Sequence, residues 1–327
     1  MRRREFIAGL GGAAIAWSRG ALAQPSPKVY RLGSLDPARP LSATGPDATI
    51  LLGALAERGY TLGRNLFYDA RACGGDNSKL PDLLQDFKAS GVDVIVTIGY
   101  PATLAAKTAG IPTVVAAGVG DPVATGLVKS LAQPGGMVTG ISDNATTLST
   151  KRLSLLKELL PRLRQVAMLF NADDLGMSLR YEASAAAANS IGVTVQSLGV
   201  REPNDFTMAF EIMDREPPDA ILMMSDTLTL LNRKRVFDYA AAKRLPAIYE
   251  SAPYVQNGGL MSYGADRKES FQRAAALVDR ILKGANPADL PFEQPTHYLF
   301  LINLGVAKAM GLEIPPSLLA LADNVIE

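Results

Sequence analysis

The polar side chains best placed to hold a ligand follow the predicted strands of this chain, at the points where those strands end. In open parallel sheets ligands bind beyond the carboxyl ends of the strands, and this rule selects the candidates. The candidate ligand-binding residues are Ser34, Asp36, Tyr100, Pro101, Ala102, Thr103, Gly120, Asp121, Ser142, Asp143, Asn171, Asp226, Glu250 and Tyr263. Hydroxyl and carboxylate groups dominate this set, and it contains no basic side chain.

The chemistry of this set suits a zwitterion such as an amino acid. The helix start at Pro101-Ala102-Thr103 presents free backbone N–H groups that can bind a carboxylate. Asp226 can accept hydrogen bonds from an ammonium group, with Glu250 as a second acceptor. Tyr100 and Tyr263 can stack on an apolar or aromatic part of the ligand. A structural explanation stays open for each residue, since Asp226 could only cap a helix and Tyr263 could belong to the core.

Motifs of common enzyme classes are missing. The first predicted strand and its turn, Arg31–Asp36, contain no G-x-G-x-x-G sequence, so dinucleotide binding has no support. Neither a Walker A loop nor a G-x-S-x-G nucleophile turn occurs. With one histidine, His297, and one cysteine, Cys73, a zinc site of several His and Cys ligands is excluded. We expect no catalytic residue, no metal and no cofactor, although the carboxylates of Asp226 and Glu250 could serve a glycosidase.

Short β-rich runs alternate with helical runs, which predicts βαβ units and parallel sheets. Runs such as Val92-Asp93-Val94-Ile95-Val96 are apolar at nearly every position, as in strands covered on both faces. The predicted strands are Val29–Leu35, Asn65–Ala72, Val92–Ile98, Thr113–Ala117, Val138–Ile141, Gln165–Phe170, Val193–Leu198, Ala220–Met224, Ala247–Tyr249, Leu260–Tyr263 and Tyr298–Asn303. The predicted helices include Ile50–Arg58, Leu80–Ser90, Thr103–Ala109, Ser149–Leu160, Leu179–Ser190, Phe206–Arg215, Arg233–Lys243 and Ser270–Lys283.

The order of elements repeats, which predicts two similar lobes facing a cleft. One block contains Gly59-Tyr60-Thr61 and Ile111-Pro112, and the other has Gly192-Val193-Thr194 and Leu245-Pro246 at the equivalent places. In both blocks a glycine ends a helix and a proline opens the last strand. The C-terminal segment has no place in the second half, so we expect it to complete the first lobe. The predicted lobes are residues 28–141 with 265–327, and residues 142–264.

The first residues are typical of an export signal. Arg3-Arg4-Glu5-Phe6-Ile7 is a twin-arginine pattern, a weakly apolar stretch follows it, and Ala21-Leu22-Ala23 is a small-x-small cleavage site. Glycines within this stretch make an ordinary buried helix a poor alternative. We expect residues 1–23 to be a twin-Arg signal peptide, cleaved near Ala23, and the mature chain to work in the periplasm.

The charge of the chain argues against several classes of partner. The whole chain has a formal charge of +1, and residues 1–23 carry four Arg and one Glu, which leaves −2 for the remainder. Such a weakly acidic surface argues against nucleic acid and anionic membranes as the main partner. No segment after the signal is long enough to cross a membrane. We expect a monomer.

A series of longer motifs runs through the chain in a specific order. They are Arg3-Arg4-Glu5-Phe6-Ile7, Val92-Asp93-Val94-Ile95-Val96, Asp121-Pro122-Val123-Ala124-Thr125-Gly126-Leu127-Val128, Gln133-Pro134-Gly135-Gly136-Met137-Val138-Thr139-Gly140, Leu245-Pro246-Ala247-Ile248-Tyr249-Glu250, Gly258-Gly259-Leu260-Met261-Ser262-Tyr263-Gly264, Leu301-Ile302-Asn303-Leu304 and Ile314-Pro315-Pro316-Ser317-Leu318-Leu319. Together they resemble the ABC-transporter substrate-binding proteins of the tryptophan/tyrosine-binding type. The resemblance implies a type I periplasmic binding-protein fold, an α/β fold with two Rossmann-like lobes and a three-strand hinge. Two features depart from the family pattern: the loop Ser34-Leu35-Asp36-Pro37-Ala38-Arg39 is more charged than the usual Ser/Gly-rich version, and Tyr100 stands where small residues are common.

We therefore expect a non-enzymatic, periplasmic solute-binding protein of an ABC importer. It would close on a small, amino-acid-like ligand and deliver it to an ABC permease in the inner membrane. Relatives of this type bind aromatic amino acids, so an aromatic or other apolar amino acid is the leading ligand. Closure would follow from ligand contacts with both lobes, which favour the closed state by their differential affinity for it. Two alternatives stay open: an exported hydrolase that uses the cleft carboxylates, and a ligand-sensing domain for a signalling partner.

Overall fold

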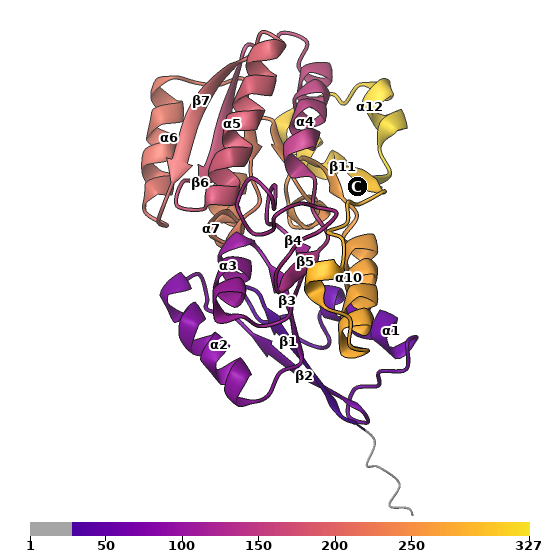
Figure 1. Ribbon diagram of the computed structural model, residues 1–327. Coiled ribbons are helices and arrows are strands. Elements are labelled where there is room, and N and C mark those ends of the chain that lie inside the picture. The colour runs from indigo at the N-terminus through magenta and orange to yellow at the C-terminus, as the bar shows by residue number, and fades with distance from the viewer. Residues whose placement is uncertain (1–27) are drawn as a thin grey trace, which may run out of the picture.

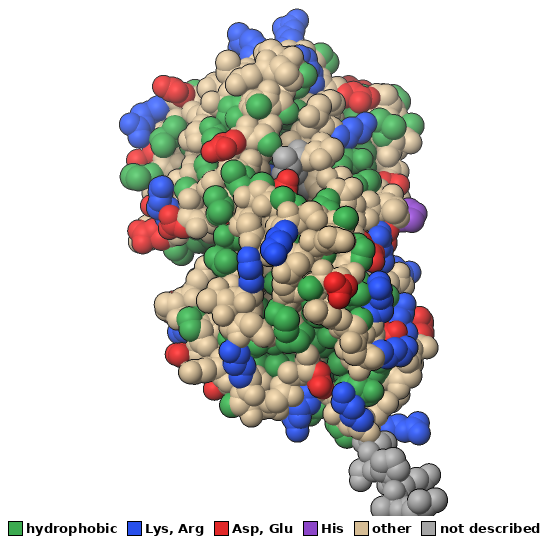
Figure 2. Space-filling model, in the orientation of Figure 1, with side chains coloured by type: hydrophobic (Ala, Val, Ile, Leu, Met, Phe, Trp, Pro, Cys, Tyr) green, Lys and Arg blue, Asp and Glu red, His purple; other side chains and the backbone are tan. Residues whose placement is uncertain are grey.

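Two lobes stacked end to end make up the computed structural model of this chain, which describes residues 28–327 (Figure 1). Each lobe is built around one β-sheet. Residues 1–23, the expected signal peptide, lie outside the described residues. Within residues 28–327, no helix combines the length and the apolar composition that a membrane crossing needs. On the face drawn in Figure 2, acidic and basic side chains are interspersed over both lobes.

The first lobe contains a five-stranded parallel sheet in the order β2-β1-β3-β4-β5. Its strands are β1 (Tyr30–Leu35), β2 (Leu66–Arg71), β3 (Val94–Ile98), β4 (Thr113–Ala117) and β5 (Val138–Gly140). Its helices are α1 (Pro46–Ala56), α2 (Leu80–Ala89), α3 (Tyr100–Ala109) and α10 (Arg267–Leu282). Val94 and Val96 pack in a core with α1 and α10, whereas Ile95 packs in another core with α2 and α3. Because both faces are covered, the strand is apolar at successive positions.

The second lobe contains a seven-stranded sheet in the order β12-β11-β10-β9-β8-β6-β7. Its strands are β6 (Gln165–Asn171), β7 (Thr194–Val200), β8 (Ala220–Met223), β9 (Ala247–Tyr249), β10 (Met261–Ala265), β11 (Tyr298–Asn303) and β12 (Asn324–Ile326). Its helices are α4 (Ala145–Leu159), α5 (Leu175–Ser190), α6 (Asp205–Arg215), α7 (Thr227–Leu231), α8 (Arg233–Lys243), α9 (Ala252–Gln256), α11 (Leu304–Met310) and α12 (Pro316–Leu321). Figure 1 shows α4 and α5 in front of this sheet.

The chain passes between the lobes three times, and the passages are hydrogen-bonded to one another. The first follows β5, the second joins β10 to α10, and the third leads to β11. The N–H of Ser142 donates to the carbonyl of Glu293 at 2.8 Å, and the N–H of Asp266 donates to the carbonyl of His297 at 3.0 Å. The two-lobed α/β fold with a three-segment hinge is therefore confirmed.

The expectation that the C-terminal segment completes the first lobe is only half right. Helix α10 packs against the first sheet through Phe271 and Val278. The expected placement of Tyr298–Asn303 there is wrong, because β11 pairs antiparallel with β10 and β12 pairs with β11. Phe300 and Ile302 join the core of the second lobe, so burial of apolar side chains fixes the strand there. The second sheet is consequently mixed rather than parallel.

The two lobes touch beside the hinge through glycine backbones. A Cβ atom built on Gly176, at the start of α5, would lie 3.0 Å from the carbonyl oxygen of Val119. A Cβ on Gly120 would lie 3.1 Å from the carbonyl oxygen of Gly176, and the φ of Gly120 is +69°, a conformation that favours glycine. A side chain at either position would crowd the backbone of the other lobe, so the close contact favours glycine at both.

Candidate functional site

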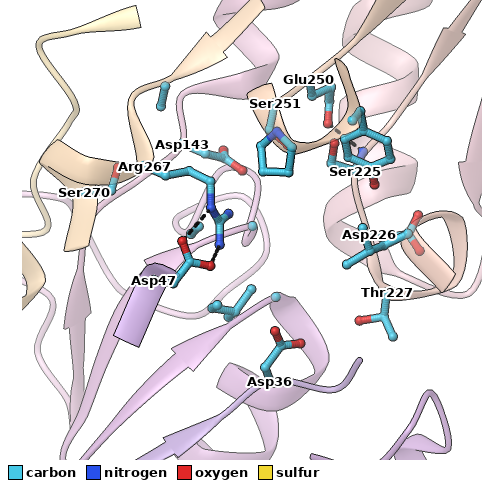
Figure 3. Close-up of a pocket in the computed structure, with 18 of the residues that line it drawn as sticks. Asp36, Asp47, Asp143, Ser225, Asp226, Thr227, Glu250, Ser251, Arg267 and Ser270 are labelled. Carbon is cyan, nitrogen blue, oxygen red and sulfur yellow. Dashed lines mark hydrogen bonds and ion pairs between the residues drawn. The ribbon is translucent and has the colours of Figure 1, made fainter. Parts of the chain in front are cut away.

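A cavity of about 150 Å³ lies between the two lobes, where the carboxyl ends of β1, β3 and β8 meet (Figure 3). Charged side chains from both lobes line it, together with apolar residues such as Leu41, Ile98 and Leu230. The charged residues are Asp36, Asp47, Asp143, Asp174, Asp226 and Glu250, with Arg39, Arg152, Arg180 and Arg267. A concave, partly apolar site with convergent polar groups is typical of small-molecule binding.

Five of the residues selected from the sequence line this cavity, namely Asp36, Pro101, Asp143, Asp226 and Glu250. The start of α3 reaches the cavity through Gly99 and Pro101, as the sequence predicts.

Three further candidates are buried inside the first lobe. The hydroxyl of Thr103 donates to the carbonyl of Gly99 at 2.8 Å and hydrogen-bonds the hydroxyl of Thr97. The hydroxyl of Ser34 hydrogen-bonds the phenol of Tyr68 at 2.8 Å. Ala102 is part of the apolar core under α3. These side chains position the strand ends rather than line the cavity.

Asp121, Ser142 and Asn171 hold local turns. The side-chain oxygen of each accepts a hydrogen bond from a backbone N–H two or three residues further on. Short polar side chains commonly stabilise turns in this way. None of the three lines the cavity formed by the described residues.

The remaining candidates lie near the cavity but not on its wall. Tyr100 lines a separate groove between α2 and α3. Gly120 makes the contact between lobes with Gly176. The ring of Tyr263 stacks on Tyr298, with 6.2 Å between the ring centroids. Tyr100 and Gly120 follow strands as predicted, whereas Tyr263 lies in the middle of β10 rather than at its end.

Asp226 is the carboxylate of this cavity that is least satisfied by the protein. Its Oδ1 accepts hydrogen bonds from the N–H groups of Leu228, at 2.6 Å, and Thr229, at 3.1 Å, and so caps α7. Its Oδ2 is buried and has no hydrogen-bond partner among residues 28–327. Burial, with a contribution from the like charge of Asp174, raises the pKa of Asp226 to about 7. A cationic group placed beside Oδ2 would satisfy it.

Two other buried carboxylates of the cavity form no ion pair with an arginine in the described part of the chain. Asp36 accepts a hydrogen bond from the N–H of Ala38 at 2.8 Å, and burial raises its pKa. Asp174 caps α5 through the N–H of Met177 at 3.2 Å, and burial raises its pKa to about 6. Together with Asp226, they give the cavity a surplus of acidic groups that favours a positively charged partner.

Glu250, in contrast, is held by two buried arginines. Its Oε1 accepts a hydrogen bond from Arg152 at 3.0 Å, and its Oε2 accepts from Arg180 at 2.5 Å and from the N–H of Ser225 at 2.8 Å. Arg180 also pairs with Asp143 at 2.8 Å. The side chains of Arg152 and Arg180 are 1% exposed and that of Glu250 is 3% exposed. Both oxygens of Glu250 are therefore occupied by the protein.

Arg267 is a cavity-lining arginine of the first lobe that forms an ion pair. Its Nε donates to Asp47 at 3.2 Å and its Nη2 donates at 2.5 Å, as the dashed lines in Figure 3 show. Asp47 lies on α1 and Arg267 opens α10, so the pair joins two helices far apart in the sequence. Arg267 also lies over the ring of Phe271, at 5.4 Å from its centroid.

The sequence reasoning missed Asp174 and the arginines because it considered only strand ends. A signal for one of them, Arg180, exists on helix α5. Arg180 lies on the same face of α5 as the buried Met177, Ser184 and Ala188, so a charged residue interrupts an otherwise small or apolar stripe. No comparable signal exists for Arg267, whose partner is 220 residues away.

Comparison with known proteins places the chain in a family. Residues 47–326 match the family model described as ABC transporter substrate binding protein. The tyrosine-binding protein of Clostridioides difficile is 26% identical over 262 residues, which are 80% of this chain and 75% of that protein. A solved structure of the ABC domain from Streptococcus pneumonia in complex with L-Trp superposes with a TM-score of 0.83 at 27% identity, covering 91% of this chain and 100% of the other.

A conserved domain protein from Vibrio cholerae superposes with a TM-score of 0.85 at 26% identity, again covering 91% of this chain and 100% of the other. The family match spans parts of both lobes and the three hinge passages between them. This chain therefore belongs to the family of ABC transporter substrate-binding proteins.

Proposed function

We propose that this chain is the periplasmic binding component of an ABC importer and that it binds an aromatic or other apolar amino acid. Support comes from its family and from two relatives, one named for tyrosine and one bound to L-Trp. The apolar wall formed by Leu41, Ile98 and Leu230 suits such a side chain. The mature chain would act as a monomer, exported by the signal peptide at residues 1–23, and would deliver its ligand to an ABC permease.

The observation that carries this proposal is the buried Oδ2 of Asp226. A buried carboxylate oxygen without a hydrogen-bond donor is costly, and a ligand ammonium in the cavity removes that cost. Asp174, Asp36 and Asp226 leave the wall acidic, which further favours an ammonium group. Glu250 does not serve as a second acceptor, because Arg152 and Arg180 hold both of its oxygens.

The ion pairs of Arg152 and Arg180 with Glu250 also favour ligand binding over hydrolysis as the function. A glycosidase needs two carboxyl groups that can exchange protons with substrate and water. Both oxygens of Glu250 accept hydrogen bonds from the protein, so Glu250 is not available as the second carboxyl group beside Asp226. A non-enzymatic receptor accounts for both residues.

Thermal unfolding of the mature chain with matched ligands tests the proposed function. L-tryptophan and L-tyrosine should raise the melting temperature, since they bind only the folded state. Indole-3-propionate, which lacks the ammonium group, should give no shift. A shift with indole-3-propionate but not with the amino acids would contradict the proposal.

The Asp226→Asn variant locates the ammonium. We expect calorimetry to show binding of L-tryptophan weakened by about tenfold or more, because a charge-assisted hydrogen bond is lost. The fold should persist, since asparagine caps helices as well as aspartate does. Asp121→Asn, which changes a carboxylate outside the cavity, is the matched control and should bind as the wild type. Unchanged affinity in Asp226→Asn would make Asp226 a helix cap only.

A further inference from the structure

We propose that Arg267 binds the carboxylate of the ligand, so that a zwitterion is held between a cation of the first lobe and Asp226 of the second. This inference rests on the function proposed above and adds to it the residue that orients the amino acid. The sequence suggested a different binding position for the carboxylate, the start of α3. The two positions can be distinguished by experiment.

The guanidinium group of Arg267 has donors left for a ligand. Its bonds to Asp47 use Nε and Nη2, on one edge of the group. Nη1 has no hydrogen-bond partner within residues 28–327 and is not among their buried unpartnered atoms, and the side chain as a whole is 26% exposed. Since Arg267 lines the cavity, the edge that is not turned to Asp47 is available there. An arginine fork binds a carboxylate through two N–H groups at once.

The position of this guanidinium group is fixed before any ligand arrives. Asp47 holds one edge, and the ring of Phe271, one turn further along α10, lies under the face at 5.4 Å. Both supports belong to helices packed against the same sheet, and α1 and α10 share one core. A side chain held in this way loses little rotamer freedom on binding, so its hydrogen bonds contribute more fully to affinity.

The other arginines of the cavity are less suited to this role. The two terminal nitrogens of Arg180 donate to Glu250 and Asp143. Arg152 donates to Glu250 and to the carbonyl of Tyr263, and its side chain is 1% exposed. Arg39 is exposed and forms no ion pair with a described residue. Arg267 is thus the cation that is both fixed by a partner and still open to the cavity.

The opposite placement of Arg267 and Asp226 has a further consequence for ligand choice. The two groups belong to different lobes and line the same cavity, with Asp36 also on its wall (Figure 3). An amino acid that spans them bonds each lobe by one of its charged groups. An amine without a carboxylate would form a charged contact only with Asp226 of the second lobe. An acid without an ammonium would form one only with Arg267 of the first lobe.

A cycle of ligand and protein variants tests the inference. L-tryptophan and L-tryptophanamide, in which a neutral amide replaces the carboxylate, are titrated by calorimetry into the wild type and into Arg267→Gln. We expect the wild type to prefer the acid by about tenfold or more, and the preference to fall close to one in Arg267→Gln. Arg64→Gln, which removes an exposed arginine outside the cavity, is the control and should keep the wild-type preference.

Each outcome decides between the possibilities. A preference that persists in Arg267→Gln overturns the role of Arg267 and points to another seat, such as the start of α3, while the proposed function stands. Equal affinity of the wild type for L-tryptophan and L-tryptophanamide also overturns the proposed role of Arg267. If the wild type binds neither L-tryptophan nor L-tyrosine, the proposed function fails along with it. Should Arg267→Gln not fold, Arg267→Lys keeps the charge without the fork and should reduce the preference.

Discussion

Asp226 and Glu250 follow neighbouring strands, β8 and β9, and yet their carboxylates differ in every partner. One oxygen of Asp226 is buried with no hydrogen-bond donor among residues 28–327, whereas Glu250 joins two buried arginines. Each residue comes shortly after a short buried strand, since β8 ends at Met223 and β9 ends at Tyr249. The difference comes from helices α4 and α5, which bring Arg152 and Arg180 beneath β9.

Replacing Glu250 by Gln should therefore damage the fold rather than the ligand contact. The change leaves Arg152 and Arg180 buried with Asp143 as the remaining carboxylate of the network, and breaking a buried ion pair costs about 3–5 kcal/mol. Urea unfolding should show a large fall in the free energy of unfolding. Asp226→Asn serves as the comparison and should stay near the wild type. A Glu250→Gln protein as stable as the wild type would contradict this account.

The raised pKa values of Asp226 and Asp174 predict that affinity and stability respond oppositely to pH. Burial raises the pKa of Asp226 from 3.8 to about 7, and that of Asp174 to about 6. Between pH 4 and the raised values the folded state binds more protons than the unfolded state, so the free energy of unfolding falls as pH rises. An ammonium needs the ionised carboxylate, so affinity should rise over the same range.

Urea unfolding of the ligand-free protein and calorimetry with L-tryptophan, each from pH 5 to 8, measure the two trends. Below the pKa of Asp226, affinity should fall by up to about tenfold per pH unit. Asp226→Asn is the control, because it removes the contribution of Asp226 to the pH dependence of both the free energy of unfolding and the affinity. Affinity that stays flat or rises toward pH 5 would show that the ligand does not meet an ionised Asp226.

At the residue scale, the sequence was informative about strand ends and silent about partners. Asp36, Asp143 and Asp226 were predicted to line the site, because parallel strands end at one edge of a sheet. Thr103 and Ser34 obey the same rule but are bonded inside the lobe. Whether a side chain at a strand end faces the cavity or the core depends on tertiary contacts, which local sequence does not encode.

At the scale of elements, the contact between Gly120 and the start of α5 predicts a simple way to hold the lobes apart. In Gly176→Val, side-chain atoms would collide with the carbonyl of Val119 when the lobes meet. The φ of Gly176 is not positive, so the backbone itself tolerates valine. We expect weaker binding of L-tryptophan with a nearly unchanged free energy of unfolding.

Gly53→Val in α1 is the matched control for Gly176→Val. A Cβ atom on Gly53 has no neighbour within 4 Å, so the variant carries the same intrinsic helix penalty without an obstacle between lobes. Calorimetry should find wild-type affinity for Gly53→Val. Wild-type affinity in Gly176→Val would mean that the lobes need not meet at this point for binding.

Most longer elements were predicted, but the short helices α7, α9, α11 and α12 and the strand β12 were not, and several helix starts and the place of β11 differ. Helix α5 begins at Leu175, not at Leu179, because Asp174 caps it and extends it by one turn beyond the apolar pattern. Strand β11 was recognised, but an apolar strand fits either sheet equally well by its sequence. Its place beside β10 is decided by the core that Phe300 and Ile302 join.

At the scale of the whole molecule, neither lobe is a continuous piece of chain. The first sheet ends with β5 at Gly140, but its face is covered by α10, which begins at Arg267. A fragment of residues 28–140 should therefore not fold, because Leu32, Val94 and Val114 would be left exposed on that face. Circular dichroism and urea titration of the fragment measure this. A cooperative unfolding transition in the fragment would contradict it.

The late position of α10 also sets an order of events during synthesis. A ribosome makes the whole of β1–β5, then the strands β6–β10 of the second lobe, and only then the helix that closes the first core. Domains generally fold as units from the N-terminus during translation. Here one face of the N-terminal sheet stays uncovered until α10 is synthesised. Most of the second lobe is therefore synthesised before the first lobe can complete its fold. Aggregation during production should consequently begin at the face of the first sheet that awaits α10.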